Sequence, residues 1–305
     1  MRSSAASDVY KRQFQGCSSL TSIEIPSSVT SIGDDAFYGT PWLTNKRQEN
    51  NSLVIVNGIL IDGRTCSGEV TIPDGVTNIG NYTFRNCTGL TSIKIPKNVT
   101  SIGKNAFDGC TDLKEVLLEN GSTLTSESLG VDASIIKTYW NEGDLTWTLT
   151  ADGTMTISGK GAMKDYSWSA SSPATQKKAS VKKVVIQEGV TSIGKYAFKD
   201  CSNLASIEIP EGVTSIGGCA FQDCSNLASI EIPNSVTSIG IVAFGSCTSL
   251  TSINIPEGVT SIGGSAFSGC TNLIDITIPE SVTSIGASAF YDTPWLTCLL
   301  YTSDA

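Results

Sequence analysis

The segment CSNLASIEIP at residues 201–210 returns unchanged at residues 224–233, 23 positions later. A fixed period in the range of about 20–50 residues is the signature of a repeat architecture, in which each repeat stacks on the next. The pattern L-x-x-I-x-I recurs in two parts of the chain, and most copies end in proline. Its first apolar positions are Leu20, Leu90, Leu113, Val181, Leu204, Leu227, Leu250 and Leu273.

A second pattern completes each repeat. V-T-[S/N]-I-G occurs eight times, beginning at Val29, Val76, Val99, Val190, Val213, Val236, Val259 and Val282. An [A/T]-F pair follows each copy, with phenylalanines at Phe37, Phe84, Phe107, Phe198, Phe221, Phe244, Phe267 and Phe290. Three residues after most of these phenylalanines stands a cysteine, so the full unit ends in A-F-x-x-C.

These patterns predict a mostly β solenoid of about 23-residue coils. L-x-x-I-x-I is expected to be a short strand with its apolar side inward, ended by proline, and the glycine of V-T-S-I-G permits a tight corner. The A-F-x-x-C segment should close the coil as a helical turn or an irregular bend. Stacked coils would bury a shared core at about 1.5–3 kcal/mol per large side chain, and their strands, about 4.8 Å apart, would form a parallel sheet. We therefore expect structural ladders of Phe198, Phe221, Phe244 and Phe267, and of Cys201, Cys224, Cys247 and Cys270.

The combined unit L-x-x-I-x-I-P-x-x-V-T-S-I-G-x-x-A-F-x-x-C resembles the BspA-like leucine-rich repeat of bacterial surface proteins. The resemblance covers most of residues 14–118 and 181–297 and extends to the missing asparagine ladder. It implies a curved α/β leucine-rich-repeat solenoid, secretion or display on the cell surface, and a role in adhesion or host contact.

The repeat also divides the chain. Asn57-Gly58 between apolar runs predicts an inserted β-hairpin, and Asp152-Gly153 predicts a second hairpin with a primed two-residue turn. The second hairpin is expected to cover the open end of the second array, with a short adhesive module as the alternative.

The ends of the chain do not fit the repeat and resemble translated sequencing-adaptor read-through in a metagenomic fragment. The expected parts are residues 1–13 and 298–305 as non-native ends, 14–118 as a first array with its hairpin at about 40–66, 119–180 as connector or cap, and 181–297 as a second array.

The amino-acid composition excludes several classes of function. The net charge of −9 argues against nucleic acid and anionic lipid, since both require clustered Lys and Arg. The chain has no histidine, which excludes Ser-His-Asp and Cys-His catalysis and every His-containing metal site. No apolar run approaches the roughly 20 residues of a membrane span. We expect no cofactor, no metal and no membrane insertion of this fragment.

The cysteine slot has several readings: a disulfide chain, a metal strip, a reactive thiol, or a small apolar side chain in a tight corner. Zinc requires four converging ligands, and no C-x-x-C pair occurs. Thr40 and Thr293 occupy the same slot, which favours the apolar filler. Cys219 lies at a variable position and could be a lone thiol, whereas Cys298 is attributed to the non-native end.

Other candidate groups also allow a chemical and a structural interpretation. Glu208 and Glu231 could mimic a retaining glycosidase pair in spacing, but a flat sheet without a pocket favours solvated decoration. Lys177, Lys178, Lys182 and Lys183 form a local basic patch, which is interpreted as a solvated loop. Trp42 and Trp295 are interpreted as plugs in interrupted coils, while exposed aromatics among Trp140, Trp147 and Trp168 could stack on glycan.

The outward strand positions of the second array are small, polar and weakly acidic, a surface that suits many weak contacts made in repetition. We expect a non-enzymatic module that binds an extracellular protein or glycan, with the variable x-x before A-F tuning partner choice. The alternative is a structural stalk that presents another domain. The candidate binding residues are Ser206, Glu208, Ser229, Glu231, Ser252, Asn254, Asp275 and Thr277.

Overall fold

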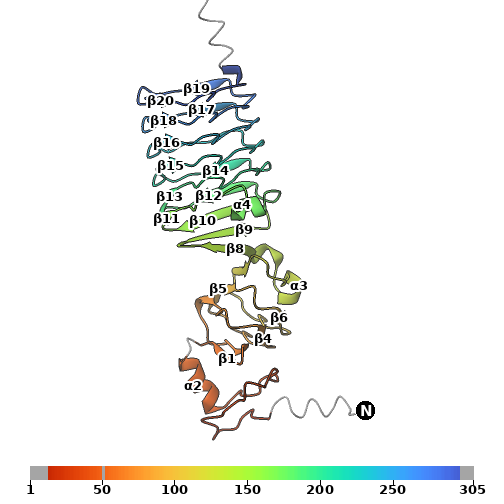
Figure 1. The fold of residues 1–305 in the computed structure, drawn as a ribbon. Helices are drawn as coiled ribbons and strands as arrows, with labels where there is room; N and C mark the ends of the chain where they lie inside the picture. Colours follow the sequence, from red (N-terminus) through yellow and green to blue (C-terminus); the bar gives the residue numbers. More distant parts are fainter. Residues whose placement is uncertain (1–12, 50–51, 296–305) are drawn as a thin grey trace, which may run out of the picture. The chain divides into compact units, whose positions relative to one another are not determined.

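The computed structural model describes residues 13–49 and 52–295, and its chain divides into two compact units, residues 1–138 and 139–305 (Figure 1). Of the two ends interpreted as non-native, all but Gln13 lie outside the described residues, and so does Cys298. The family of coils expected from the sequence is confirmed: equivalent residues of neighbouring coils pair in parallel, 23 positions apart, as at Ile216 and Ile239.

The first unit contains short strands and two short helices. Its strands β4 and β6 carry copies of V-T-[S/N]-I-G, and β5 and β7 carry copies of L-x-x-I-x-I. The elements are α2 (Pro41–Glu49), β1 (Val54–Val56), β2 (Ile59–Asp62), β3 (Gly68–Thr71), β4 (Asn78–Ile79), β5 (Leu90–Ile95), β6 (Ser101–Ile102), β7 (Glu115–Glu119), α3 (Ser126–Leu129) and the 3-10 turn η1 (Ala133–Ile135). The strand β8 (Ile136–Glu142) carries the chain into the second unit.

The hairpin expected at Asn57-Gly58 is present, and it forms part of an irregular coil. β1 and β2 are antiparallel, and the positive φ angles of Asn57 (51°) and Gly58 (78°) make a primed turn. β2 then pairs in parallel with β4, while β3 pairs in parallel with β5. The segment from β2 to β3 therefore occupies both sides of one coil, which is how the stack continues through the interruption.

The helix α2 was not predicted, although the local signals for it are present in T-P-W-L-T. Thr40 accepts a hydrogen bond from the backbone N–H of Leu43 at 3.1 Å, as an N-cap does. Pro41 occupies the first helical position, where its missing N–H costs nothing, and Lys46 and Arg47 lie in the last turn. Arg47 also makes two hydrogen bonds to the buried Asp62 carboxylate, at 2.8 and 2.9 Å.

The second unit begins with an antiparallel hairpin and continues as regular coils. Two short strands per coil recur along most of its length. The elements are β9 (Leu145–Thr150), β10 (Thr154–Gly159), β11 (Gly161–Ala162), α4 (Pro173–Gln176), β12 (Lys183–Ile186), β13 (Val190–Ser192), β14 (Ser206–Glu208), β15 (Ser215–Ile216), β16 (Ser238–Ile239), β17 (Ser252–Asn254), β18 (Ser261–Ile262), β19 (Asp275–Thr277) and β20 (Ser284–Ile285).

One part of the hairpin prediction at Asp152-Gly153 is wrong. Both kinds of primed two-residue turn need positive φ at the first central residue, but Asp152 does not have it and Gly153 does, at 96°. The pairing of Leu149 with Met155 and the bond from the Gly153 N–H to the Thr150 carbonyl (3.1 Å) define a three-residue loop. The side chain of Asp152 also accepts the Thr154 N–H at 3.1 Å, which holds this wider turn.

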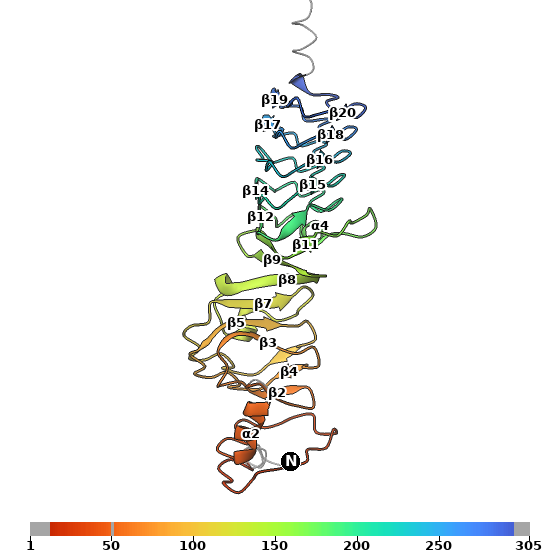
Figure 2. The same cartoon turned by 90° about the vertical axis from the view of Figure 1, so that its left-hand side faces the viewer.

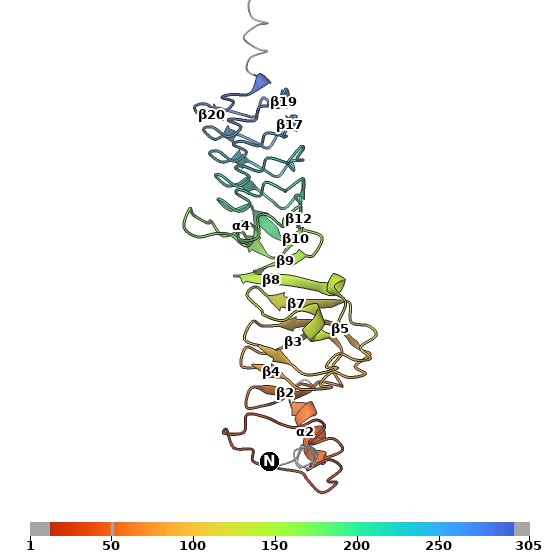
Figure 3. The ribbon, with the colours of Figure 1, turned by 90° about the vertical axis from the view of Figure 1, so that its right-hand side faces the viewer.

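In the second unit the strands of the V-T-S-I side form a more continuous sheet than the strands of the L-x-x-I-x-I side. β15, β16, β18 and β20 form one four-stranded parallel sheet along the V-T-S-I side, whereas β17 and β19 pair separately from β14 (Figure 2; Figure 3 gives the opposite view). Residues 229–231 form no strand, so the sheet expected on the L-x-x-I-x-I side is interrupted there. Side-chain hydrogen bonds between neighbouring coils also stabilise the V-T-S-I side. The hydroxyl of Thr237 donates to the backbone carbonyl of Thr214 at 3.1 Å, and the hydroxyl of Thr260 donates to the backbone carbonyl of Thr237 at 3.3 Å.

The A-F-x-x-C segment closes each coil as an irregular bend rather than a helical turn. The residue before A-F and the residue before the cysteine both adopt positive φ, as at Cys219 (55°) and Asp223 (61°). Val242 adopts this conformation too, at 57°, although it is strained for a β-branched residue. In the first unit Asn105 holds the same place, and Asn tolerates the left-handed region well.

The core of the second unit is organised around a column of phenylalanine rings. Phe198, Phe221, Phe244, Phe267 and Phe290 stack with centroid distances of 5.2–5.5 Å and interplanar angles of 1–12°. The first four are fully buried. Trp147 of β9 packs on Phe198 at one end (5.7 Å), and Trp295 packs on Phe290 at the other (5.0 Å).

The glycine that ends V-T-S-I-G is required because neighbouring coils approach each other closely at the corner. A Cβ added at Gly240 would lie 2.5 Å from the backbone nitrogen of Gly218, and backbone cannot move aside cheaply. Gly263 and Gly286 meet the coil before them in the same way. The close approach, rather than a positive φ, is therefore what keeps this position a glycine.

We predict that Gly240→Ala lowers the free energy of unfolding by about 1–3 kcal/mol, the usual cost of overpacking a well-packed site. Gly212→Ala is the matched control, because its added Cβ would meet nothing closer than 3.4 Å. Urea denaturation followed by circular dichroism measures both variants. Equal midpoints for the two variants would contradict the steric explanation.

Candidate functional site

The eight predicted binding residues lie together on one side of the second unit. We call Ser206, Glu208, Ser229, Glu231, Ser252, Asn254, Asp275 and Thr277 the polar strand face. All eight are exposed. Between the two face residues of each coil the isoleucine points inward and is at most 8% exposed, at Ile207, Ile230, Ile253 and Ile276.

Pairing of strands sets the neighbours within this face. Ser252 lies opposite Asp275 and Asn254 opposite Thr277 in the β17–β19 pair, as the parallel register requires. Ser206 and Glu208 of β14 lie opposite Lys183 and Val185 of β12. The face therefore presents columns of small polar side chains over a row of buried isoleucines.

The solvated-loop interpretation holds for three of the four lysines, since Lys177, Lys178 and Lys182 are exposed and lie outside the helices and strands. Lys183 belongs to β12, and its ammonium contacts the Glu208 carboxylate at 2.6 Å. Lys178 instead contacts Asp200 at 3.3 Å. Glu208, one of the two glutamates at glycosidase-like spacing, thus has a cationic partner, whereas Glu231 forms no ion pair within the described residues.

The cysteine slot is filled by buried thiols that donate to backbone carbonyls of the preceding coil. Cys224 donates to the Phe198 carbonyl at 3.1 Å, Cys247 to Phe221 at 3.2 Å and Cys270 to Phe244 at 3.1 Å. The cysteines of the described chain are free, and no group of metal ligands is found within residues 13–49 and 52–295. The sulfur thus packs as a small side chain with one weak hydrogen bond.

Burial changes the chemistry of these thiols. Desolvation, followed by the nearby charge of Asp200, raises the pKa of Cys201 to about 12. Burial likewise raises the pKa of Cys270 to about 12 and places those of Cys224 and Cys247 well above the usual range. Because the thiolate is the reactive form, these side chains are poor nucleophiles near neutral pH.

The tryptophans have different environments. Trp42 is buried against Phe37 (4.4 Å between ring centroids), and Trp295 packs on Phe290. Trp140 and Trp147 are 7% and 0% exposed, so neither can stack on a ligand from solvent. Trp168 is the exception at 82% exposed.

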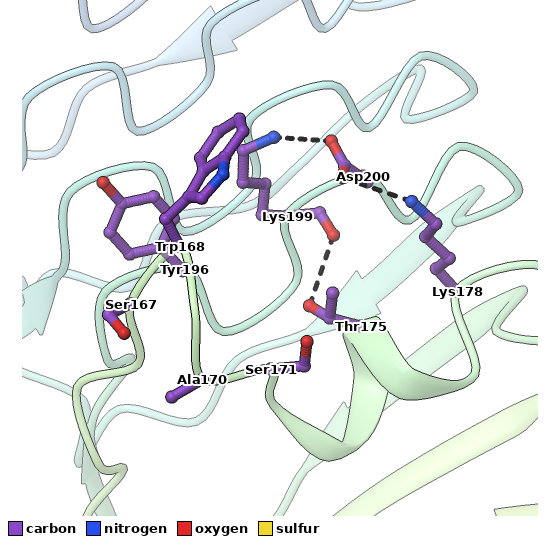
Figure 4. Close-up of a pocket in the computed structure, with 9 residues that line it drawn as sticks. All are labelled: Ser167, Trp168, Ala170, Ser171, Thr175, Lys178, Tyr196, Lys199 and Asp200. Atoms are coloured by element: carbon purple, nitrogen blue, oxygen red, sulfur yellow. Dashed lines mark hydrogen bonds and ion pairs between the residues drawn. The ribbon is translucent and has the colours of Figure 1, made fainter.

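Trp168 borders a pocket that the sequence analysis did not predict. Its lining combines the loop around Trp168 with Thr175, Lys178, Tyr196, Lys199 and Asp200 (Figure 4). The available signal was the residue after Phe198: this slot holds Lys199 in the first full coil, but Gln222, Gly245, Ser268 and Tyr291 in the others. Without the fold, nothing connected that lysine to a tryptophan 31 positions earlier.

The repeat unit can be compared with known families now that its geometry is described. The family model described as BspA type leucine rich repeat region matches residues 3–114, 63–129 and 171–297 in six copies. The chain belongs to the BspA-type leucine-rich repeat family. The matched ranges cover both repeat arrays.

Several solved structures are similar to this BspA-type chain. A leucine-rich repeat protein from Bacteroides ovatus is 25% identical over 93% of this chain and 67% of its own, with a TM-score of 0.44. A leucine-rich cell surface protein from Faecalibacterium prausnitzii is 28% identical over 92% of this chain and 72% of its own (TM-score 0.38). A leucine-rich repeat protein from T. pallidum is 25% identical over 54% of this chain and 94% of its own (TM-score 0.39). No curated protein matches the chain.

The helices found in residues 13–49 and 52–295 of this BspA-type chain are all short. Within the part of the chain that the structure describes, none has the length and apolar character needed to cross a lipid bilayer.

We predict that native protein treated with iodoacetamide at about pH 8 is alkylated at the exposed Cys17 and the half-buried Cys219. Cys201, Cys224, Cys247 and Cys270 should react only after unfolding, because they are buried and their pKa values are raised. Peptide mass spectrometry before and after addition of guanidinium measures each site. Alkylation of Cys224 or Cys247 in the native protein would contradict the assignment of these thiols to the core.

Proposed function

We propose that this chain is a non-enzymatic binding module of a secreted or cell-surface bacterial protein, and that its polar strand face engages an extracellular protein. The observation that carries the proposal is the repeated placement of exposed polar side chains over buried isoleucines on consecutive coils. The secreted or surface location rests on the family resemblance.

The form of the face supports a protein partner. Four coils spaced by about 4.8 Å present side chains over about 15 Å along the stack, a width that suits a partner surface better than a single small molecule. A stable protein interface buries about 800 Å² on each side, and many shallow contacts reach that area together. Serine, threonine and asparagine can each donate and accept, so the face can match varied partner groups.

The chemistry of the face supports binding without catalysis. Its ionisable groups are Glu208, Glu231 and Asp275, and the first of these contacts Lys183 at 2.6 Å. All three are exposed, and none lines the pocket beside Trp168. A general acid or base must lie within hydrogen-bond reach of a bound substrate, and an open face offers no enclosed position for one.

We also infer that the β9–β10 hairpin in the connector acts as a cap for the second array. β10 pairs in parallel with β12, so the hairpin adds two strands to the first coil's sheet. The fully buried Trp147 covers the first phenylalanine of the ring column at 5.7 Å. Both contacts support a covering role, because a terminal coil would otherwise expose its apolar face.

We predict that a display library of secreted proteins and cell-surface ectodomains contains a binder of the purified chain, and that Ser229→Arg with Ser252→Arg weakens that binding at least tenfold. Two added arginines in the centre of the face would obstruct close contact. Ile241→Arg is the control, since it places a charge at a 64% exposed position outside the face. Biolayer interferometry measures the affinities.

Unchanged affinity of the double variant would exclude the polar strand face as the binding surface. Absence of any binder in the library would favour the stalk alternative, in which the arrays space another domain. Matching circular dichroism spectra of the three proteins establish that the substitutions act on binding and not on folding.

A further inference from the structure

The pocket beside Trp168 in the second unit is a preformed concave site of about 280 Å³ (Figure 4). Ligand pockets for drug-sized molecules run from about 300 to 1,000 Å³, so this volume suits one ring-sized group. The lining comes from the loop Ser167–Ser171, from Thr175 and Lys178 around helix α4, and from the coil segment that holds Tyr196, Lys199 and Asp200. No residue of the polar strand face lines it.

The tryptophan loop is constrained by its own hydrogen bonds. Ser167 and Ala170 exchange two backbone hydrogen bonds, at 3.1 and 3.3 Å, and form an antiparallel bridge with Trp168 at the tip. The hydroxyls of Ser167 and Ser169 lie 3.2 Å apart. This tight turn holds a large aromatic side chain that is 82% exposed, so its ring is accessible to a ligand in the pocket.

The loop is also fixed to the coil beneath it. The hydroxyl of Ser172 donates to the carbonyl of Ala197, and that of Thr175 donates to the carbonyl of Lys199 at 3.4 Å. These contacts tie both ends of helix α4's first turn to the segment that carries the pocket's charged residues. A site ordered before binding loses less conformational freedom when the ligand arrives.

Lys199 connects the aromatic and polar halves of the pocket. Its ammonium lies 4.9 Å from the centroid of the Trp168 ring, within cation–π distance. It also contacts Asp200 at 2.6 Å and Asp223 at 3.4 Å, and the residue is only 9% exposed. Partial burial lowers the pKa of Lys199, but the hydrogen bond and charge of Asp200, together with Asp223, raise it overall, so the group stays cationic.

The charges in and around the pocket balance. Lys178 and Lys199 are both neutralised by Asp200, and Lys199 also by Asp223. A phosphate or sulfate group requires cations that are not already paired, so this balance disfavours an anionic ligand. The Asp200 carboxylate has about four lone-pair directions, of which the two lysines use two, which leaves acceptors for hydroxyl donors.

We propose that this pocket binds one neutral pyranose residue of a glycan, with the C–H face of the sugar against the Trp168 ring. A sugar is apolar on one face and rich in hydroxyls around its rim. The electron-rich ring face of an indole attracts the polarised C–H bonds, while Asp200 accepts hydroxyl protons and the remaining ammonium hydrogens of Lys178 reach hydroxyl oxygens. This site stands independently of the function proposed for the polar strand face.

The test is an array of neutral, sialylated and sulfated glycans probed with the full chain, biotinylated and assembled on streptavidin so that weak single-site binding becomes measurable. We expect binding to neutral hexose-terminated glycans. Trp168→Ala should weaken it at least tenfold, and Trp168→Phe, which keeps an aromatic face, should weaken it less. Tyr291→Ala is the control, because Tyr291 is an exposed aromatic (66%) at the repeat slot equivalent to Lys199.

Three results would overturn the proposal: no binding to any neutral glycan, equal binding by Trp168→Ala and wild type, or binding restricted to sialylated or sulfated glycans. Because Trp168 is exposed, its substitution should leave the thermal unfolding midpoint unchanged, so loss of binding would not reflect loss of folding. The variant Ser229→Arg with Ser252→Arg should retain glycan binding, which separates this site from the polar strand face.

Discussion

The contact between like side chains of neighbouring coils is the interaction on which the rest of the structure depends. In the second unit it is seen most plainly in the phenylalanine rings, which stack 5.2–5.5 Å apart from Phe198 to Phe290. A single coil of about 23 residues has no opposite layer against which to bury its apolar face, so each coil is stable only beside another. The 23-residue period in the sequence therefore reflects the requirement that like side chains of neighbouring coils pack against each other.

Several local features follow from that spacing. The coils approach so closely at the V-T-S-I-G corner that only glycine fits at Gly240, and the bend after it requires left-handed residues even where valine must adopt them, at Val242. The buried cysteine thiols donate to backbone carbonyls of the previous coil. Outward side chains take no part in this packing, which leaves the polar strand face and the pocket beside Trp168 free to differ in their chemistry.

The sequence was sufficient for features that depend on neighbouring residues or on the repeat period, and insufficient for contacts between distant residues that the period does not relate. The coil period and the primed hairpin at Asn57-Gly58 could be predicted, because each depends on residues close in sequence or related by the period. The helix after Thr40 was not predicted, although Thr40 as N-cap and Pro41 at the first helical position are both local signals for a helix. The contact of Lys183 with Glu208, and that of Lys199 with Trp168, joins residues 25 and 31 positions apart, and neither could be found before the coils were placed.

Deletion of one coil tests the central claim most directly. Removal of residues 224–246 joins Asp223 to Cys247 and leaves every remaining residue in register. This 23-residue deletion should keep native circular dichroism and a cooperative urea transition, with modestly reduced stability. Removal of residues 224–235 deletes half a coil, puts V-T-S-I-G directly after Asp223 in the slots of residues 224–228, and should abolish the cooperative transition of the array. Similar behaviour of the two deletions would contradict a fold held together by in-register stacking.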